Sequence, residues 1–151
     1  AKAPTPLIKQ AMQSIHARPA RVVERAAEVL ASEGCSLAGA KVIVVGVSYK
    51  AGVSDVRESP ALLIIDGLAE RGAEMAYHDP LVPAIQTPQG RVLSNTVTPC
   101  GAGWNLAVIH GVHPDTDYSW VQDCPQVLDA TYLFDGLTES PSTGAMRRSV
   151  V

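Results

Sequence analysis

The sequence lacks the features that define several classes of protein. Its 151 residues include only three cysteines, without a C-x-x-C pair, so neither a disulfide framework nor a zinc site is expected. We instead expect reduced, mostly buried thiols at Cys35, Cys100 and Cys124. No apolar run is long enough to span a membrane, and the N-terminus lacks the apolar core of a signal peptide, so we expect a cytoplasmic protein. The net charge of −3, without a basic cluster outside the tail, argues against a nucleic-acid surface.

Familiar catalytic and cofactor motifs are also missing. Gly46 is followed by Val47 and Ser48, so the dinucleotide fingerprint G-x-G-x-x-G is absent at the position where it would be expected. Spacing supports neither a Ser–His–Asp nor a Cys–His arrangement, and we assign no catalytic residue. His110 and His113 lie three positions apart, but no third ligand is obvious, so we assign no metal site.

The clearest element that is present is the short apolar run Lys41–Val45. Such a β-branched, nearly unbroken run is typical of a strand buried on both faces of a sheet. A polar loop follows it, and then Ser59 can cap a helix that Pro60 begins. Ligands of open α/β sheets bind beyond the carboxyl ends of the strands. Lys50, in this loop, could therefore bind a phosphate or carboxylate, or it could be an ordinary solvated lysine.

Other charged residues near this loop allow two interpretations. Asp55, Arg57 and Glu58 could serve a ligand, or they could form a local salt-bridged turn. The sequence His78-Asp79-Pro80 is most simply the end of a strand and a turn. Asp79 lies where a ribose-binding acid lies in many α/β folds, but the missing glycines weaken that interpretation.

The N-terminal part of the sequence predicts one long amphipathic helix over Leu7–Glu33, with apolar residues recurring at steps of three and four. Pro19 interrupts the pattern, so a kink or break is expected near residues 17–18. Gly34 is a suitable C-cap. A helix of this length before the first strand is unusual in a compact domain, and it suggests a connector that packs against something absent from this chain.

The remaining pattern predicts an α/β domain. Elements are expected as follows: a helix over 60–71, strands over 73–78, 106–110 and 126–128, and a helical turn over 118–122. The expected inward face of the helix comprises Leu62, Leu63, Ile65, Leu68 and Ala69. Residues 81–103 give a weak signal, with at most a short strand over 91–93. Together these elements predict a Rossmann-like three-layer domain with a mostly parallel sheet and helices on both faces, preceded by the long connector helix.

Two segments, GVSYK at 46–50 and SDVRESP at 54–60, closely resemble the signature G-[LV]-[AS]-[FY]-K…D-x-R-E-S-P. This signature marks the C-terminal domain of the UDP-glucose/GDP-mannose dehydrogenase family. The resemblance covers residues 7–136, and its further parts are 11–30 (the end of the family's central helix), 72–80, 106–113 and 127–129.

The resemblance implies that this chain is part of an enzyme. Members of this family oxidise the C6 hydroxymethyl of a nucleotide-sugar to a carboxylate, with two NAD molecules and a cysteine nucleophile. That cysteine, its lysine and aspartate partners, and the glycine motif that binds NAD belong to N-terminal and central domains that this sequence does not contain. The implied function is the C-terminal, nucleotide-sugar-binding fragment of an NAD-dependent oxidoreductase, inactive by itself. Its implied partners are a UDP-sugar, the missing domains, and a second copy bound through the central helix.

The resemblance also assigns roles to residues of the charged loop. Tyr49 is expected to contact the nucleotide-sugar through its ring and backbone, and Lys50 through a charge-assisted bond to phosphate or sugar oxygens. Arg57 is expected to reach across an interdomain cleft to the NAD pyrophosphate, which suits the bidentate geometry of guanidinium. Asp55 and Glu58 are expected to hold the loop.

The sequence departs from the family after the last strand, where the family usually has D-[TG]-R and this chain has Asp129-Ala130-Thr131. Thr131 therefore takes the position of a substrate-binding arginine, and its hydroxyl can bind a phosphate but brings no charge. Another cation could substitute (Arg91, Arg147 or Arg148), the affinity could be lower, or the parent enzyme could have changed substrate. Alternatively, the chain serves as a non-catalytic scaffold or oligomerisation domain that no longer binds nucleotide.

The expected organisation has three parts. Residues 1–38 form the end of the connector helix, 39–137 the nucleotide-sugar-binding domain, and 138–151 a disordered tail rich in Ser, Thr, Pro, Gly and Arg. Because the first residue is Ala1 and not methionine, we expect a piece of a longer protein. The candidate sugars are glucose and N-acetylhexosamines, and the segment 48–50 slightly favours the latter.

Overall fold

The computed structural model describes residues 6–131 and 147–150, with side chains described for residues 18–131. Its elements are α1 (Pro6–Ser32), β1 (Lys41–Val45), α2 (Pro60–Glu70), β2 (Glu74–His78), β3 (Ala84–Gln86), β4 (Val92–Ser94), β5 (Leu106–Ile109), the 3-10 helix η1 (Ser119–Asp123), β6 (Gln126–Asp129) and β7 (Arg147–Val150). No helix in the described ranges is both long enough and apolar enough to cross a lipid bilayer.

A parallel five-stranded sheet forms the centre of the domain, in the order β2-β1-β5-β6-β7. Strand β1, second in this order, pairs with β2 on one side and with β5 on the other, so that Val44 lies opposite both Tyr77 and Val108. The chain runs from β1 through α2 to β2 and then returns to the other side of β1. This reversal places a topological switch point between β1 and β5, which is where open α/β sheets bind ligands.

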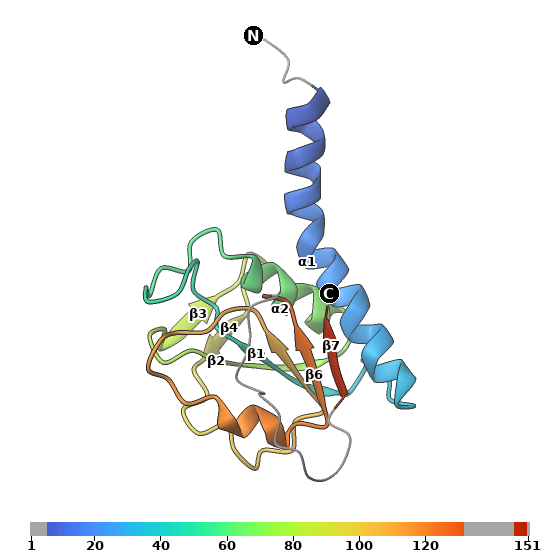
Figure 1. The fold of residues 1–151 in the computed structure, drawn as a ribbon, viewed down its shortest axis with the longest axis vertical. Coiled ribbons are helices and arrows are strands. Elements are labelled where there is room, and N and C mark those ends of the chain that lie inside the picture. Colours follow the sequence, from blue (N-terminus) through green and yellow to red (C-terminus); the bar gives the residue numbers. More distant parts are fainter. Residues whose placement is uncertain (1–5, 132–146, 151) are drawn as a thin grey trace.

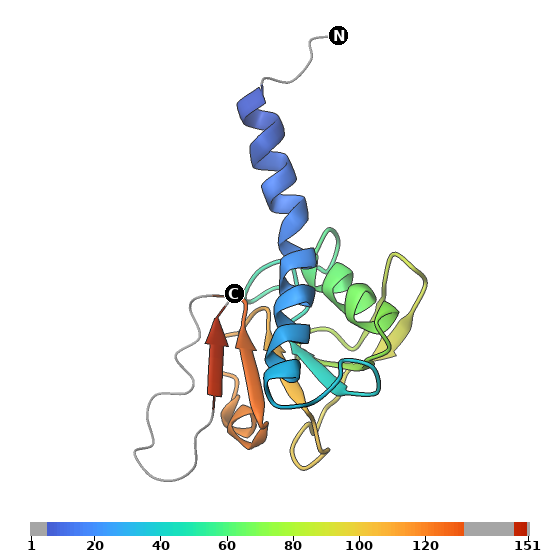
Figure 2. The ribbon, with the colours of Figure 1, turned by 90° about the vertical axis from the view of Figure 1, so that its right-hand side faces the viewer.

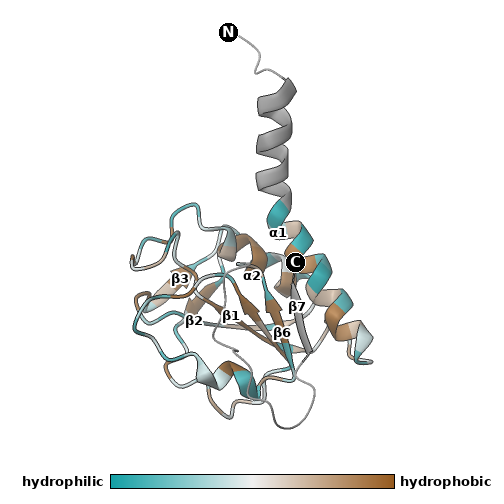
Figure 3. Cartoon of the chain, in the orientation of Figure 1, coloured by the Kyte–Doolittle hydropathy of each residue, from teal (hydrophilic) through white to brown (hydrophobic). Residues whose placement is uncertain are grey.

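The two faces of the sheet have different covers. Val42 and Val44 of β1 face a core formed with α1 and α2, whereas Ile43 and Val45 face a smaller core with η1 and Trp104. Figures 1 and 2 show α1 and α2 on the same side of the sheet, and Figure 3 shows β1, β6 and α2 as predominantly hydrophobic. The predicted Rossmann-like α/β class is confirmed, but the described residues that cover the second face form a short 3-10 helix and loops and not the expected α-helix.

Helix α1 is continuous from Pro6 to Ser32, so the break expected at Pro19 is absent. The proline removes one backbone donor, but the half that follows it is held by side chains buried against the domain, among them Val22, Ala26 and Leu30. The half before it projects away from the sheet (Figures 1 and 2). The helix ends as expected near Gly34, which has a φ of 74°.

Helix α2 begins as the sequence predicts, because the Ser59 hydroxyl accepts a hydrogen bond from the Ala61 N–H at 3.3 Å and Pro60 occupies the first turn. Its buried face is rotated from the expected one: Leu63 is 47% exposed, whereas Ile64 is buried. At 3.6 residues per turn, residues 61, 64, 65 and 68 share one stripe and residue 63 lies outside it.

The weakly patterned region contains an antiparallel pair, β3–β4, of which the sequence predicted only one short strand. Buried Asp66 of α2 holds this pair by accepting hydrogen bonds from the Thr87 hydroxyl at 2.6 Å and the Gln89 N–H at 3.1 Å. The Arg91 guanidinium lies 3.3 Å from the same carboxylate. Asp66 is therefore the buried attachment of the hairpin to the helix, and the Gln89 side-chain amide adds an exposed hydrogen bond to Glu70.

Two further expectations differ from the structure. Residues 147–150, inside the tail expected to be disordered, form β7 beside β6, while the rest of that tail and residues 132–137 lie outside the described residues. Of the three cysteines, Cys35 and Cys100 are exposed and only Cys124 is buried, because the first two lie in surface loops. Burial raises the pKa of the Cys124 thiol to about 11.

Candidate functional site

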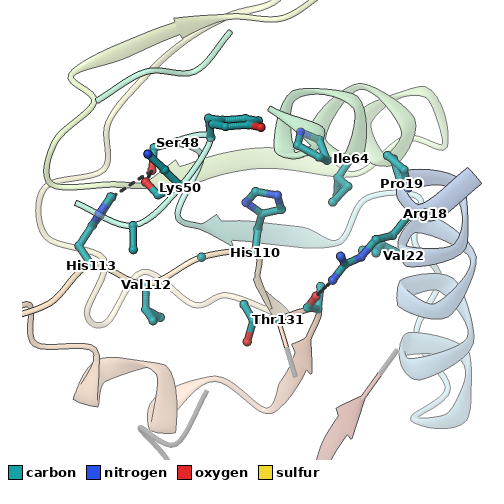
Figure 4. A pocket seen from close by; sticks show the side chains of 15 residues that line it. Arg18, Pro19, Val22, Ser48, Lys50, Ile64, His110, Val112, His113 and Thr131 are labelled. Atoms are coloured by element: carbon teal, nitrogen blue, oxygen red, sulfur yellow. Dashed lines mark hydrogen bonds between the residues drawn. The ribbon is translucent and has the colours of Figure 1, made fainter. Parts of the chain in front are cut away.

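A pocket of about 670 Å³ lies at the carboxyl ends of β1, β5 and β6, at the switch point of the sheet. Its lining comes from the loops after these three strands and from the facing sides of α1 and α2 (Figure 4). The lining residues are Arg18, Pro19, Val22, Ser48, Tyr49, Lys50, Ala51, Pro60, Ile64, His110, Gly111, Val112, His113, Ala130 and Thr131. The site is therefore assembled from five segments of the chain, of which the first and the last are 112 positions apart at Arg18 and Ala130.

The charges in this lining favour an anion. Lys50 and Arg18 are its permanently charged side chains, and none of the described residues that line it is an aspartate or glutamate. The Arg18 Nη2 atom donates a hydrogen bond to the Ala130 carbonyl at 2.5 Å, which directs the guanidinium across the end of β6 (Figure 4). Phosphate and carboxylate groups are the ligands that such an arrangement binds.

Buried Asp79 fixes the backbone of the loop that carries Lys50. Its Oδ2 atom accepts hydrogen bonds from the N–H groups of Val47 at 2.9 Å and Ser48 at 3.2 Å. Its Oδ1 atom lies 2.8 Å from His113 Nε2. Since Asp79 is 0% exposed and its oxygens hold the loop, it is a structural residue and not a ribose-binding acid.

His113 holds the same loop from the other side. The Gly52 N–H donates to His113 Nδ1 at 2.8 Å, so the ring proton must lie on Nε2, which donates to the Asp79 carboxylate. This neutral tautomer joins residues before and after Lys50 to a single buried pair. Lys50 is thereby held at the pocket by its backbone, while its side chain remains exposed.

His110 occupies the middle of the pocket (Figure 4). Its Nδ1 atom lies 3.0 Å from the Gly46 carbonyl, which can only accept, so Nδ1 carries the proton and Nε2 is the nitrogen that can contact a bound molecule. Burial lowers the pKa of His110, the bond to Gly46 opposes this shift, and the charge of Arg18 adds to it. At neutral pH the imidazole is therefore uncharged. His110 and His113 serve different partners and do not form a metal-binding pair.

The structure separates the residues that the sequence nominated. Tyr49, 59% exposed, lies at the rim of the pocket, and Lys50 and Thr131 line its wall. Arg57 lies outside it, in a second, shallower hollow of about 320 Å³ formed with Tyr49, Asp55 and Glu58. Tyr49 lines both spaces. The single loop therefore presents Lys50 to one hollow and Arg57 to the other.

The salt-bridged turn considered from the sequence is present in this loop. The Arg57 guanidinium donates to both carboxylate oxygens of Asp55, at 3.1 and 3.0 Å, and its side chain is 87% exposed. These hydrogen bonds lower the pKa of Asp55. Glu58 adopts a left-handed backbone conformation with a φ of 61°, so both acids shape the loop.

Thr131 is committed to its own strand end, because its hydroxyl donates to Asp129 Oδ1 at 2.7 Å. Of the cations considered as substitutes for the missing arginine, Arg91 pairs with Asp66 at the hairpin and does not line the pocket. The side chains of Arg147 and Arg148 lie outside the described residues. The cation that does lie beside Thr131 is Arg18, which sequence reasoning missed because 112 positions separate it from Ala130.

Comparison with known proteins gives consistent matches. Residues 43–138 match the UDP-binding domain of the UDP-glucose/GDP-mannose dehydrogenase family. A UDP-glucose 6-dehydrogenase of Rickettsia bellii is 35% identical over 75 residues, which are 50% of this chain and 17% of that protein. A UDP-N-acetyl-D-mannosamine dehydrogenase of Methanococcus vannielii is 48% identical over 40 residues, 26% of this chain and 9% of that protein.

The fold is shared with solved structures. The UDP-D-ManNAc dehydrogenase of Pyrococcus horikoshii superposes with a TM-score of 0.76 at 22% identity, over 99% of this chain and 34% of that one. An NDP-N-acetyl-D-galactosaminuronic acid dehydrogenase of Methanosarcina mazei superposes with a TM-score of 0.70 at 19% identity, over 85% of this chain and 28% of that one. The chain thus spans about a third of the length of these structures.

Proposed function

Because this chain belongs to the UDP-glucose/GDP-mannose dehydrogenase family, as its UDP-binding domain, we propose that the pocket at the switch point binds the nucleotide diphosphate of a UDP-sugar. The observation that carries this proposal is the pocket itself: it lies beyond the carboxyl ends of β1, β5 and β6, with Lys50 and Arg18 in its lining and no acidic side chain among the described lining residues. A diphosphate diester brings two negative charges, which this lining complements.

The proposed contacts follow from the positions of the side chains. Lys50 donates to a phosphate or sugar oxygen, and Tyr49, exposed at the rim, offers its ring to the base or ribose. The hydroxyl and the backbone N–H of Thr131 both donate to Asp129 Oδ1, so Thr131 offers the ligand its hydroxyl oxygen as an acceptor for a ribose or sugar hydroxyl. Neutral His110 can accept a hydrogen bond at Nε2 from a ribose or sugar hydroxyl.

We further propose that the parent protein is an NAD-dependent dehydrogenase that oxidises C6 of UDP-glucose or a UDP-N-acetylhexosamine to the carboxylate. The two curated relatives named above carry these two substrates in their names. The oxidation removes four electrons as two hydrides, which is the chemistry that NAD supplies when it is bound. None of this chain's cysteines lines the pocket, so this chain alone binds the substrate without turning it over.

The fit of this chain to NAD is limited to one residue. The loop after β1 has Gly46 but lacks the rest of the dinucleotide-binding glycine motif. A Cβ atom on Gly46 would lie 2.2 Å from the Gly111 carbonyl oxygen, so the loops after β1 and β5 are too close at this point to hold a pyrophosphate between them. Arg57 is exposed on the other side of Tyr49. Its guanidinium can bind the NAD pyrophosphate if it gives up its ion pair with Asp55. The remaining NAD contacts belong to the domain that would face this hollow.

The proposed partners of this domain use the projecting end of α1. Its N-terminal half extends beyond the sheet (Figure 1), which supports the proposal that residues 1–38 are the end of a central connector helix. In the parent protein this helix would pack against the N-terminal and central domains and against a second copy. Residues 39–137 would then be the nucleotide-sugar-binding domain.

The test is a titration of isotope-labelled protein with UDP and GDP, up to millimolar concentration, followed by amide NMR. We expect UDP to shift the resonances of residues 46–52, 110–113 and 131, and the Lys50→Ala variant to lose this response. Glu74→Ala, at the opposite end of the sheet and exposed, is the matched control and should respond like the wild type. If no resonance moves at millimolar UDP, the chain is a scaffold or oligomerisation domain and the proposal fails.

A further inference from the structure

We propose that Arg18 binds the diphosphate of the nucleotide-sugar together with Lys50, so that helix α1 supplies the second cation of the site. This inference rests on the proposed function and specifies how the site achieves it. It assigns the role of a missing β6 arginine to a residue that precedes the domain in the sequence. The nucleotide site would then be shared between the connector helix and the sheet.

The position of Arg18 is the first ground for this proposal. Its Nη2 atom lies 2.5 Å from the carbonyl oxygen of Ala130, the residue that precedes Thr131. Figure 4 shows the guanidinium pointing from α1 to the end of β6, on the His110 side of the pocket. A guanidinium carries five N–H donors in a planar fork, so it can hold this carbonyl and a phosphate oxygen together.

The second ground is charge balance. Lys50 supplies one positive charge against the two negative charges of a diphosphate diester, and Arg18 is the other permanent cation among the described lining residues. Arg57 faces the separate hollow with Asp55, and Arg91 is paired with Asp66. The field of Arg18 reaches the middle of the pocket, because it contributes to lowering the pKa of His110.

The third ground is that the helix turn carrying Arg18 is held in place. Pro19 and Val22 line the same wall of the pocket, and Val22 is only 1% exposed. A Cβ atom on Gly67 of α2 would lie 2.8 Å from Val23 Cγ2, so the two helices approach each other closely at this level. The backbone that carries Arg18 is thus already ordered, so binding a ligand would restrict only its exposed side chain.

The experiment compares UDP affinities of the whole chain and its variants by calorimetry or NMR titration. Arg18→Ala should weaken UDP binding roughly 10- to 100-fold, the effect of losing one charged hydrogen-bonding partner. Arg21→Ala, on the same helix and exposed but outside the pocket lining, is the matched control and should bind like the wild type. Lys50→Ala should lose binding as well. Thermal unfolding of each variant verifies that α1 remains docked.

A reciprocal substitution separates a charge role from a structural one. Thr131→Arg in the Arg18→Ala background should restore most of the lost affinity, because it returns a guanidinium to the adjacent strand end. A variant that had merely undocked α1 would not be rescued in this way. In the wild-type background the same substitution should gain much less.

The outcomes distinguish this inference from the proposed function. If Lys50→Ala abolishes UDP binding but Arg18→Ala does not weaken it, the site is a nucleotide site and the role of Arg18 is refuted. If Arg18→Ala weakens binding but Thr131→Arg does not rescue it, Arg18 acts through the packing of α1 and the inference is equally refuted. If the wild type binds no UDP at millimolar concentration, the inference falls together with the proposed function.

Discussion

Single residues at the end of β1 decide whether the pocket can exist. Gly46 has a φ of 77°, and a Cβ atom on it would lie 2.2 Å from the Gly111 carbonyl oxygen. The closeness of these two loops brings the residues after β1 next to His110, whose ring donates to Gly46. The shape of the pocket between these two strand ends therefore depends on a glycine that does not line it.

Gly46→Ala should cost about 3–5 kcal/mol of unfolding free energy, because it combines a left-handed backbone with a direct overlap. Gly90→Ala is the matched control: its φ is 86°, but nothing lies within 4 Å of the added atom. Gly90→Ala should cost only the free energy of placing alanine in a left-handed backbone conformation, about 1–2 kcal/mol. Urea denaturation of both variants measures the difference, and equal costs would show that β1 and β5 do not approach as described.

His110 makes the stability of the domain depend on pH. Burial lowers its pKa in the folded protein, so between this value and the unfolded value of about 6.5 the unfolded chain binds more protons. The free energy of unfolding should therefore fall as the pH decreases from 7 to 5, with a contribution of at most about 1.4 kcal/mol per pH unit. His110→Asn, whose amide nitrogen takes the place of Nδ1, keeps a donor for Gly46 and should reduce this slope, which urea denaturation at several pH values measures. An unchanged slope would contradict the assignment.

At the scale of elements, the sequence predicts what burial on both faces imposes. The strands β1, β5 and β6 are apolar runs because each is covered on two sides. The predicted bounds of β1 match the observed ones, and those of β5 and β6 differ by one residue. Short β3 and β4 each have one inward residue, Ile85 and Leu93, between two exposed ones, which gives too little signal over three positions. The predicted inward face of α2 was wrong at Leu63, because apolar residues lie on several sides of this helix and do not define which side is buried.

The hairpin β3–β4 is attached to α2 mainly through Asp66. Asp66→Ala should cost about 2–4 kcal/mol of unfolding free energy, because it leaves the hydroxyl of Thr87 and the N–H of Gln89 without their acceptor. Arg91→Ala removes the partly exposed member of the ion pair and should cost at most about 1 kcal/mol. Chemical denaturation gives both values, and faster amide exchange over residues 84–94 should accompany only the first variant. Similar effects of both would mean that the ion pair, and not the hydrogen-bonded carboxylate, holds the hairpin.

At the scale of the whole molecule, the site joins segments that no local pattern connects. Tyr49 and Lys50 could be nominated from sequence because they lie in one contiguous motif after a recognisable strand. Arg18 could not, since an arginine on an amphipathic helix has the same local pattern whether it faces solvent or a ligand, and its contact is 112 positions away. The buried pair of Asp79 and His113 was missed for the same reason, because its function is to hold a loop from two distant strand ends.

A ligand that contacts both Arg18 and Lys50 must hold α1 against the sheet. We therefore expect saturating UDP to slow amide exchange over residues 18–32 of α1, because any local opening of this helix would first have to release the nucleotide. At a UDP concentration of 100 times the dissociation constant, the free energy of any opening that abolishes binding should rise by about 2.7 kcal/mol. Exchange mass spectrometry of the whole chain, with and without UDP, measures this protection. The hairpin over residues 84–94, outside the pocket lining, serves as the internal control for openings that leave the site intact.

The Arg18→Ala variant decides how this protection arises. When it is saturated at 100 times its own dissociation constant, the loop at 46–52 should still be protected, because Lys50 still holds the nucleotide. The additional protection of α1 should disappear, because among the side chains described for the helix only Arg18 can bond to the phosphates. If α1 remains as strongly protected in the variant as in the wild type, its docking does not depend on the ligand, and the connector helix does not take part in nucleotide binding.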